Sequence, residues 1–215
     1  MNHAGEGVIK FHLAHADIAA LPREETEALR GWFPIFRQIG LLGQEPGRYE
    51  GCAWGNLSLR SKAGFVITCT QSSAQQQLGP EHFALVTGFD VKTNSLQSKG
   101  PCRPSSEAMS HGVVYQTLPQ VAAVFHVHSQ DIWRQAETLG LAVTDPAVEY
   151  GTPEMAGCIE TLLQNQDFSG ELLFSMGGHE DGIIACADSA DRAAALLLRT
   201  LARAYRLSIN PALRS

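Results

Sequence analysis

The stretch AAVFHVHS, residues 122–129, decides how the rest of this sequence is interpreted. Its first four residues are apolar enough for a buried β-strand, and His126 and His128 follow two positions apart. Because side chains alternate between the faces of a strand, both imidazoles leave the same face while Val127 enters the other. That spacing suits joint coordination of one metal ion. Two such histidines can equally be hydrogen-bonded or solvated, so the surrounding sequence has to decide.

A helix is predicted directly before this strand. Ser105 can cap its start, and Pro119 ends it after Leu118. Glu107 opens this helix. The helix packs back and leads into the strand, so the Glu107 carboxylate is expected near the two histidines. An acidic residue in a first helical turn also favours the helix dipole without any catalytic role. The local sequence leaves both interpretations of Glu107 open.

A third histidine, His179, follows in the segment MGGHEDG, residues 176–182. The glycines that flank it permit close approach of the backbone to a ligand or a metal ion. The alternative is an ordinary surface turn. Three imidazoles would leave coordination positions open on an ion, which is the pattern of a catalytic site and not of a closed structural site.

Helices and strands are expected to alternate around these segments. A first helix is predicted at about residues 24–42, with a disturbance before Pro34, and a final helix at residues 189–206. Thr152 caps a further helix that Pro153 opens. Short runs of branched and aromatic residues predict strands at residues 54–60, 65–68, 83–89, 122–127, 171–175 and 182–186. The pattern favours a sheet between helical layers.

Composition narrows the class of protein. A chain of 215 residues that is 44% hydrophobic and 18% charged fits one domain, residues 1–215, best. Its 16 basic and 22 acidic residues give a net charge of −6, and no dense Lys/Arg cluster is present, which argues against nucleic acid as a partner. The longest apolar runs are far shorter than the roughly 20 residues of a membrane helix.

The expected location is the cytoplasm, because residues 1–10 show neither a basic leader nor an apolar stretch before a cleavage site. The cysteines point the same way. They are five in number, scattered and without any Cys-x-x-Cys pair, so reduced and mostly buried thiols are predicted.

Together these segments resemble the class II aldolase/adducin family of sugar-phosphate aldolases, epimerases and dehydratases. The matching pieces follow one order over most of the chain: GNLSLR at 55–60, ITCT at 67–70, PSSE at 104–107, His111, AVFHVHS at 123–129 and the Gly178-His179 turn before Ile183. The resemblance implies a three-layer α/β/α fold with a central, largely antiparallel sheet. It also implies that the metal ligands are His126, His128 and His179.

The resemblance further implies that Glu107 can touch the metal and then act as the catalytic acid/base. His111, one helical turn further on, matches a family histidine, and a supporting or packing role is expected for it. Zinc is the first expectation for the divalent ion, with manganese, cobalt and iron as alternatives because no thiolate is among the ligands. Relatives imply a closed homo-oligomer, a tetramer, that acts on a small molecule.

The implied activity is that of a metal-dependent lyase. Its substrate would be a small hydroxy-ketone, sugar phosphate or hydroxy-keto acid, cleaved by a retro-aldol reaction through a metal-stabilised enediolate. A dehydratase or an epimerase would use the same metal site and differ in a second acid/base, for which Glu149, Tyr150 and Glu154 are candidates. A non-catalytic, adducin-like interaction module is the alternative from another class, because a fold does not fix function.

The resemblance also implies a site for the substrate phosphate, formed by small polar residues and backbone amides at Gly55, Asn56, Thr70, Ser105 and Ser106. One residue departs from the family pattern. Gln71 stands where the pattern has glycine, and Cys69 replaces a proline in the same turn. A side chain at residue 71 is expected to fill the space or to prevent the backbone conformation that lets an amide reach the phosphate. Weakened phosphate binding and a non-phosphorylated hydroxy-keto acid substrate are therefore predicted.

Overall fold

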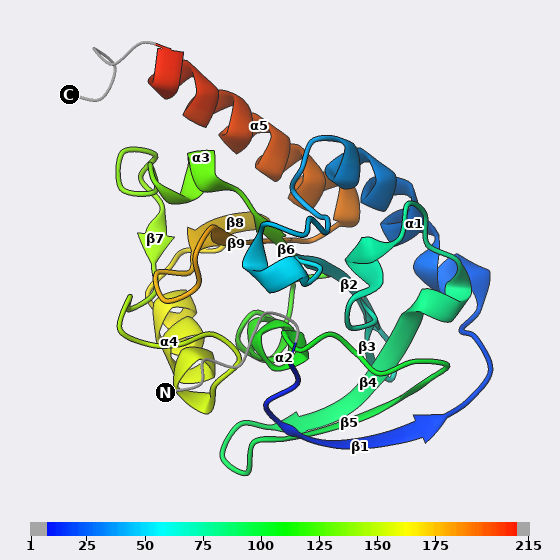
Figure 1. The fold of residues 1–215 in the computed structure, drawn as a ribbon. Coiled ribbons are helices and arrows are strands. Elements are labelled where there is room, and N and C mark those ends of the chain that lie inside the picture. The colour runs from blue at the N-terminus through cyan, green and yellow to red at the C-terminus, as the bar shows by residue number, and fades with distance from the viewer. Residues whose placement is uncertain (1–7, 210–215) are drawn as a thin grey trace.

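A central nine-stranded sheet organises the computed structural model, which describes residues 8–209 (Figure 1). Residues 1–7, part of the segment that was expected to lack a secretory leader, lie outside that range. The strand order is β1-β5-β4-β3-β2-β6-β9-β8-β7. The strands are His12–Asp17 (β1), Asn56–Ser61 (β2), Gly64–Thr68 (β3), Phe83–Asp90 (β4), Ser95–Gly100 (β5), Ala123–His128 (β6), Ala142–Val143 (β7), Glu171–Ser175 (β8) and Gly182–Ala187 (β9). The pairs β1–β5 and β7–β8 are parallel and the other neighbours antiparallel, which confirms the prediction of a largely antiparallel sheet.

Helices cover both faces of this sheet. They are Arg23–Gln38 (α1), Ala108–Thr117 (α2), Gln130–Trp133 (α3), Pro153–Gln164 (α4) and Ala190–Ile209 (α5). In Figure 1, α1, α3 and α5 lie on one side of the sheet and α2 and α4 on the other. The buried side chains accordingly form two cores, one with α1 and α5 and one with α2 and α4. The architecture is therefore the three-layer α/β/α arrangement that the sequence predicts.

Strand β6 shows how the two cores fix the direction of the histidines. Phe125 and Val127 belong to the core under α1 and α5, whereas Val124 belongs to the core under α2 and α4. Since side chains alternate along a strand, His126 and His128 leave the face of Val124. Every residue of β6 is buried. The apolar alternation thus directs both imidazoles to the α2/α4 side of the sheet.

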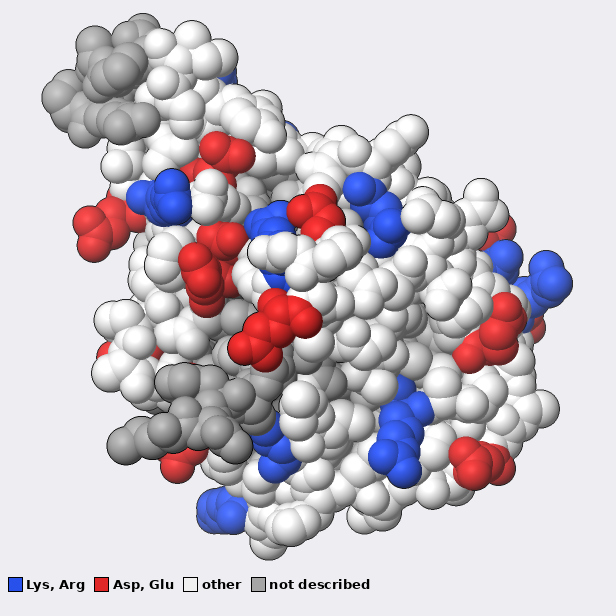
Figure 2. All heavy atoms as spheres, in the orientation of Figure 1, with Lys and Arg blue, Asp and Glu red and all other residues white. Residues whose placement is uncertain are grey.

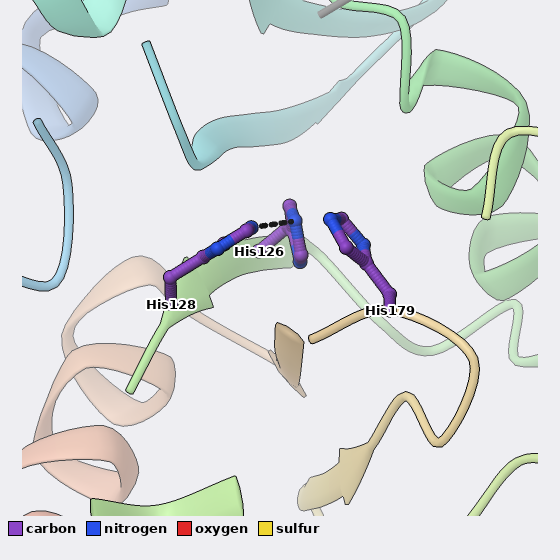
Figure 3. Close-up of side chains that lie close together, drawn as sticks. All are labelled: His126, His128 and His179. Atoms are coloured by element: carbon purple, nitrogen blue, oxygen red, sulfur yellow. Dashed lines mark hydrogen bonds between the residues drawn. The ribbon is translucent and has the colours of Figure 1, made fainter. Parts of the chain in front are cut away.

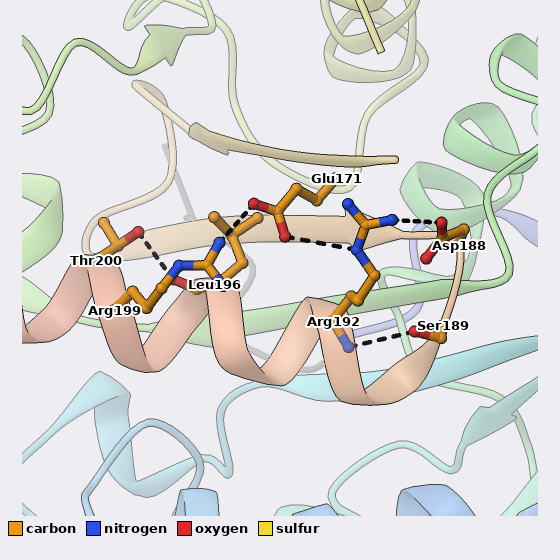
Figure 4. Close-up of polar contacts among 7 residues, drawn as sticks. All are labelled: Glu171, Asp188, Ser189, Arg192, Leu196, Arg199 and Thr200. Atoms are coloured by element: carbon orange, nitrogen blue, oxygen red, sulfur yellow. Dashed lines mark hydrogen bonds and ion pairs between the residues drawn. The ribbon is translucent and has the colours of Figure 1, made fainter. Parts of the chain in front are cut away.

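Ion pairs connect the start of α5 to β8 (Figure 4). Glu171 contacts both Arg192 and Arg199, and Arg192 also pairs with Asp188 at 2.6 Å. These pairs are partly exposed and contribute little stability, roughly 0–1 kcal/mol each. The apolar face of α5 contributes more, because Ala193, Leu197, Thr200 and Leu201 are buried against the sheet.

Several elements differ from the prediction. Helix α1 ends at Gln38, earlier than the predicted residue 42, and it continues through Pro34. The strands β1 and β5 were not predicted, because their sequences, HLAHAD and SLQSKG, contain few branched or aromatic residues. The prediction that all cysteines are reduced thiols is wrong for Cys69 and Cys102, which form a disulfide. The disulfide joins the loop before α2 to the turn after β3. No local sequence motif predicts this contact between distant segments.

The distribution of surface charge and the character of the helices can be compared with the partners that the sequence predicts. Figure 2 shows basic and acidic side chains interspersed over the visible face, without a continuous basic surface for nucleic acid. Within residues 8–209, no helix combines the length and the apolar character needed to cross a membrane.

Candidate metal centre

Three buried histidines converge at the edge where β6 ends (Figure 3). His126 and His128 come from β6, and His179 comes from the turn between β8 and β9. Their candidate ligand atoms all lie within 4.8 Å of one another, and the Nε2 atoms of His126 and His128 are 3.2 Å apart. The structure therefore brings together the three histidines that the sequence predicts as a metal site.

The chemistry of the rings fits a divalent ion. His126 Nδ1 lies 3.2 Å from the carbonyl oxygen of Ile183. Because a carbonyl only accepts, Nδ1 bears the proton and Nε2 presents a lone pair toward His128. Burial, and then the neighbouring His179, holds the pKa of His126 and of His128 well below the ordinary value for histidine. Both rings are therefore neutral at neutral pH, which is the form that binds metal.

Glycines shape the turn that presents His179. A Cβ atom at Gly178 would lie 1.7 Å from the carbonyl oxygen of Val148, so the backbone passes closer than any side chain allows. A Cβ atom at Gly182 would lie 3.0 Å from Cγ of His179. These glycines thus allow the backbone to pack closely within the turn, and their expected close approach to a ligand or metal ion stays a prediction. The interpretation of this segment as an ordinary surface turn is wrong, because His179 is only 3% exposed.

A polar group beside His128 was not found from the sequence. The Tyr49 hydroxyl donates to Asp181 Oδ2 at 2.6 Å, and Arg48 contacts the same oxygen at 3.1 Å. The Tyr49 ring also stands edge-on to the His128 ring, with centroids 4.7 Å apart. Burial, and then the bond to Asp181, raises the pKa of Tyr49 far above its usual value, so the phenol remains a donor.

A cleft of about 360 Å³ opens beside His128. Arg48, Gln130, Asp131 and Tyr205 are among the residues that line it. His128 is the member of the cluster that lines this cleft.

Glu107 is buried but is not a member of the histidine cluster. It is the residue immediately before α2, and it is 1% exposed. Its Oε2 accepts from the Ser110 hydroxyl at 3.2 Å, and its Oε1 lies 4.0 Å from where a Cβ atom at Gly151 would be. Among residues 8–209, only the three histidines form a group of ligand atoms within 4.8 Å of one another. The Ser105 hydroxyl accepts from the backbone N–H of Glu107 at 3.2 Å in the turn before α2, but the N-cap residue of α2 is Glu107 and not Ser105 as predicted.

Of the three candidates for a second acid/base, Tyr150 lies against the cluster. Its ring stacks on His179, with centroids 4.1 Å apart and an interplanar angle of 17°. Glu149 is exposed and pairs with Lys10 at 2.7 Å, and Lys10 lies over the Tyr150 ring. Glu154 is exposed in the first turn of α4, as expected for a residue that serves the helix dipole.

His111 lies in the core of the protein. It is fully buried, its Nδ1 lies 2.6 Å from the Ser58 hydroxyl, and Ser58 also contacts the hydroxyl of Tyr115 at 2.8 Å. Burial lowers the pKa of His111 to about 3. A neutral ring with a defined partner agrees with the supporting role expected for this residue.

The positions expected to bind the substrate phosphate meet in one small hollow, which we call the hydroxyl hollow. It is lined by Ala53, Gly55, Asn56, Cys69, Thr70, Gln71, Ser73, Ser105 and Ser106. All five expected residues are among these. Gln71 is also present and adopts a left-handed backbone with φ 59° and ψ 7°. The expectation that a side chain at this position prevents the glycine-like conformation is therefore wrong.

Comparison with known proteins identifies the family. The profile of the Class II Aldolase and Adducin N-terminal domain matches residues 47–206. The chain therefore belongs to the class II aldolase/adducin family. Members of this family include metal-dependent aldolases and dehydratases, and the three-histidine cluster fits a divalent metal ion.

Individual relatives refine this picture only in part. Methylthioribulose-1-phosphate dehydratase of Pseudomonas syringae pv. syringae is 34% identical over 98 residues, which are 43% of this chain and 46% of that protein. The match thus spans about half the length of this relative. The crystal structure of L-fuculose-1-phosphate aldolase from Thermus thermophilus has a TM-score of 0.65 at 19% identity, over 87% of this chain and 94% of that one. A sugar-phosphate aldolase from Thermotoga maritima has a TM-score of 0.61 at 14% identity, over 86% and 95% of the chains. These structures show the shared fold.

Proposed function

We propose that this protein is a metal-dependent lyase that cleaves a small hydroxy-ketone between carbon atoms by a retro-aldol reaction. The observation that supports this most is the convergence of three buried imidazoles, of which those of His126 and His128 are neutral. Such a set of groups is costly to bury unless a bound ion and a substrate use it.

In this proposal His126, His128 and His179 hold one divalent ion, with zinc as the first choice and manganese, cobalt or iron as alternatives. When bound, the ion would supply Lewis-acid polarisation of the substrate carbonyl and stabilise the negative charge that cleavage leaves on oxygen. Tyr49 and Asp181 keep the His128 ring in position, and Tyr150 supports the His179 ring by stacking.

Glu107 is the proposed acid/base. Its burial and its hydrogen bond from Ser110 fix the carboxylate on the same side of the sheet as the histidines. We propose that Glu107 accepts the proton of the substrate hydroxyl as the carbon–carbon bond breaks. It then returns that proton to the carbon fragment. Before the substrate binds, Glu107 would also contact the ion.

A dehydratase is the second candidate, because the matched Pseudomonas relative bears that name. Elimination of water requires a group that protonates the leaving hydroxyl. We propose Tyr150 for this role, because its ring stacks on His179, whereas Glu149 pairs with Lys10 at the surface. The interaction-module alternative is disfavoured, because all four proposed site residues are present and buried.

One experiment separates these candidates. The protein is loaded with zinc, manganese, cobalt or iron and incubated with a panel of hydroxy-ketones and their phosphates, and products are followed by proton NMR. Retro-aldol cleavage releases two carbonyl fragments, whereas dehydration yields one product of unchanged carbon number. A fully metal-loaded protein that converts none of these compounds would contradict the enzymatic proposal.

The proposal includes a closed homotetramer in the cytoplasm. Exposed apolar side chains on and directly after α1, at Ile35 and Ile39, and on α5, at Tyr205 and Ile209, offer surface for contacts between copies. Light scattering at micromolar concentration tests this, and a monomer would contradict it.

A further inference from the structure

The hydroxyl hollow gives information on the choice of substrate. This inference rests on the proposed lyase activity. The hollow adjoins the metal centre, because Asn56 lies directly opposite His126 in the ladder between β2 and β6. Side chains of such a pair leave the same face of a sheet and are neighbours. The end of a short substrate that reaches the cluster therefore falls at Asn56.

The hollow is too small for a phosphate group. Its volume is about 10 Å³, and roughly 10–15 Å³ of such volume holds one water molecule. Gln71 limits this space from the solvent side, since it is exposed and lines the hollow. Its Oε1 accepts from the backbone N–H of Ala53 at 2.8 Å, which ties the turn after β3 to the segment before β2.

Four backbone N–H groups in or beside the hollow, those of Ala53, Thr70, Ser105 and Glu107, already donate to acceptors within the protein. Gln71 takes the N–H of Ala53, while the N–H groups of Thr70 and Ser105 donate to the carbonyl oxygens of Arg103 and Thr68. The N–H of Glu107 donates to the Ser105 hydroxyl. Among the described residues that line the hollow, none is a lysine, arginine or histidine. A phosphate dianion would find neither a positive charge nor this set of backbone amides.

What the hollow offers instead is an acceptor. Asn56 is only 6% exposed, and its Oδ1 is buried without a hydrogen-bond partner among the described residues. A buried acceptor is costly unless a donor reaches it. A substrate hydroxyl brings a proton to Asn56 Oδ1, whereas a phosphate dianion brings none.

The backbone conformation of Gln71 also supports a functional role for its side chain. A residue other than glycine at φ 59° is uncommon and unfavourable. Glycine would satisfy this turn without strain, yet a side chain is present and closes the hollow. Strained residues of this kind occur at functional sites.

We propose that Gln71 determines substrate choice by excluding phosphate from the hydroxyl hollow, so that the substrate is an unphosphorylated ketose-like compound with a hydroxyl group at that end. Gln71 and Asn56 act together: the first narrows the hollow and occupies the Ala53 amide, and the second accepts the hydroxyl proton.

The decisive test uses inorganic phosphate and the metal-free protein, so that neither metal nor turnover enters. Binding is measured by calorimetry for the wild type, Gln71→Gly and Gln75→Gly, the last being an exposed glutamine of the same loop that does not line the hollow. We expect Gln71→Gly to bind phosphate at least fivefold more tightly than the other two proteins. A gain of less than fivefold would overturn the assignment of Gln71.

A second measurement separates this inference from the proposed function. The zinc-loaded wild type and Gln71→Gly are compared on matched free and phosphorylated ketoses. We expect the wild type to favour the free compound and Gln71→Gly to shift the ratio of kcat/KM toward the phosphate at least tenfold. Preference of the wild type for the phosphorylated compound, unchanged in Gln71→Gly, would overturn the inference. Absence of turnover with a retained fivefold gain in phosphate binding would overturn the lyase proposal and leave the role of Gln71 supported.

Discussion

Asn56 and His126 lie directly opposite one another on neighbouring antiparallel strands, β2 and β6. One belongs to the hydroxyl hollow and the other to the histidine cluster. Their side chains leave the same face of the sheet, so the ladder itself sets the spacing between the end of a bound molecule and the metal centre.

Removal of a cluster histidine should abolish metal binding. We expect the wild type to bind about one divalent ion per chain, and His126→Ala or His128→Ala to lower the affinity by roughly 100-fold or more, since loss of outer partners alone costs roughly 10–100-fold. Elemental analysis after dialysis measures this. His12→Ala, on exposed β1, is the matched control and should retain the ion. Full occupancy in the His126 and His128 variants would contradict the ligand assignment.

Replacement of Glu107 should separate metal binding from chemistry. Glu107→Gln keeps an acceptor for the Ser110 hydroxyl but cannot transfer a proton, so metal content should stay unchanged while kcat falls by roughly 10²–10⁴-fold. Glu154→Gln, an exposed carboxylate of α4, should leave both values unchanged. An active Glu107→Gln enzyme would remove this residue from the mechanism.

The turn that holds His179 should not tolerate a side chain at Gly178. In Gly178→Ala the added methyl meets the Val148 carbonyl at 1.7 Å, so the turn must shift, at a cost of about 1–3 kcal/mol in the free energy of unfolding and with weaker metal binding. Gly157→Ala is the matched control. Its Cβ meets nothing within 4 Å in helix α4, so stability should rise by about 0.4–1 kcal/mol. Equal metal affinity in the two variants would show that the turn does not position His179.

His111 should make the metal-free protein less stable in acid. Its folded pKa of about 3 lies below the ordinary value of about 6.5, so the unfolded chain binds more protons between these limits. Its contribution is complete above pH 6.5 and is lost as the pH falls through this window, at up to about 1.4 kcal/mol per pH unit.

His111→Asn removes this titration while it keeps a polar atom near the Ser58 hydroxyl. Denaturant unfolding at pH 7.5 and pH 5 should therefore show a smaller loss of stability for the variant than for the wild type, by about 2 kcal/mol. Equal losses would show that His111 titrates normally.

The disulfide between Cys69 and Cys102 should stabilise the protein through the loop that it closes. With a sequence separation of 33 between the two cysteines, the oxidised wild type should exceed Cys102→Ser by roughly 2–4 kcal/mol in the free energy of unfolding. Cys158→Ser, which alters a free thiol of α4, should change little. Mass spectrometry of the unreduced protein should find the two cysteines linked, and two free thiols there would contradict the pairing.

The parts of the fold that follow from local patterns could be predicted. The central strands and α4 and α5 were found because their apolar residues recur with the period of a strand or a helix. The edge strands β1 and β7 were missed, as was β5 beside β1, since partly exposed strands near a sheet edge place weak demands on composition. Glu107 was expected in the first turn of α2 and instead precedes it, a boundary that depends on how Ser105 bonds the backbone.

For the site, the sequence was informative where residues share one element. The spacing of His126 and His128 on one strand predicts that their side chains lie on the same face and close together. The contact between Tyr49 and Asp181 joins residues 132 positions apart, so no spacing in the sequence could reveal it. Gln71 was recognised as a departure, yet its left-handed backbone depends on the turn that surrounds it and not on its own preference.

The alternation along β6 has a consequence for how the chain acquires its structure. A slip of one residue against β9 would turn both imidazoles into the apolar core under α1 and α5, and would turn Phe125 and Val127 to the face that holds the histidine cluster. Only the correct register assembles three imidazoles, and a ligand that binds only the native state stabilises that state by mass action. Metal that binds while the chain folds would therefore favour the correct pairing of β6 with β9, before any substrate is present.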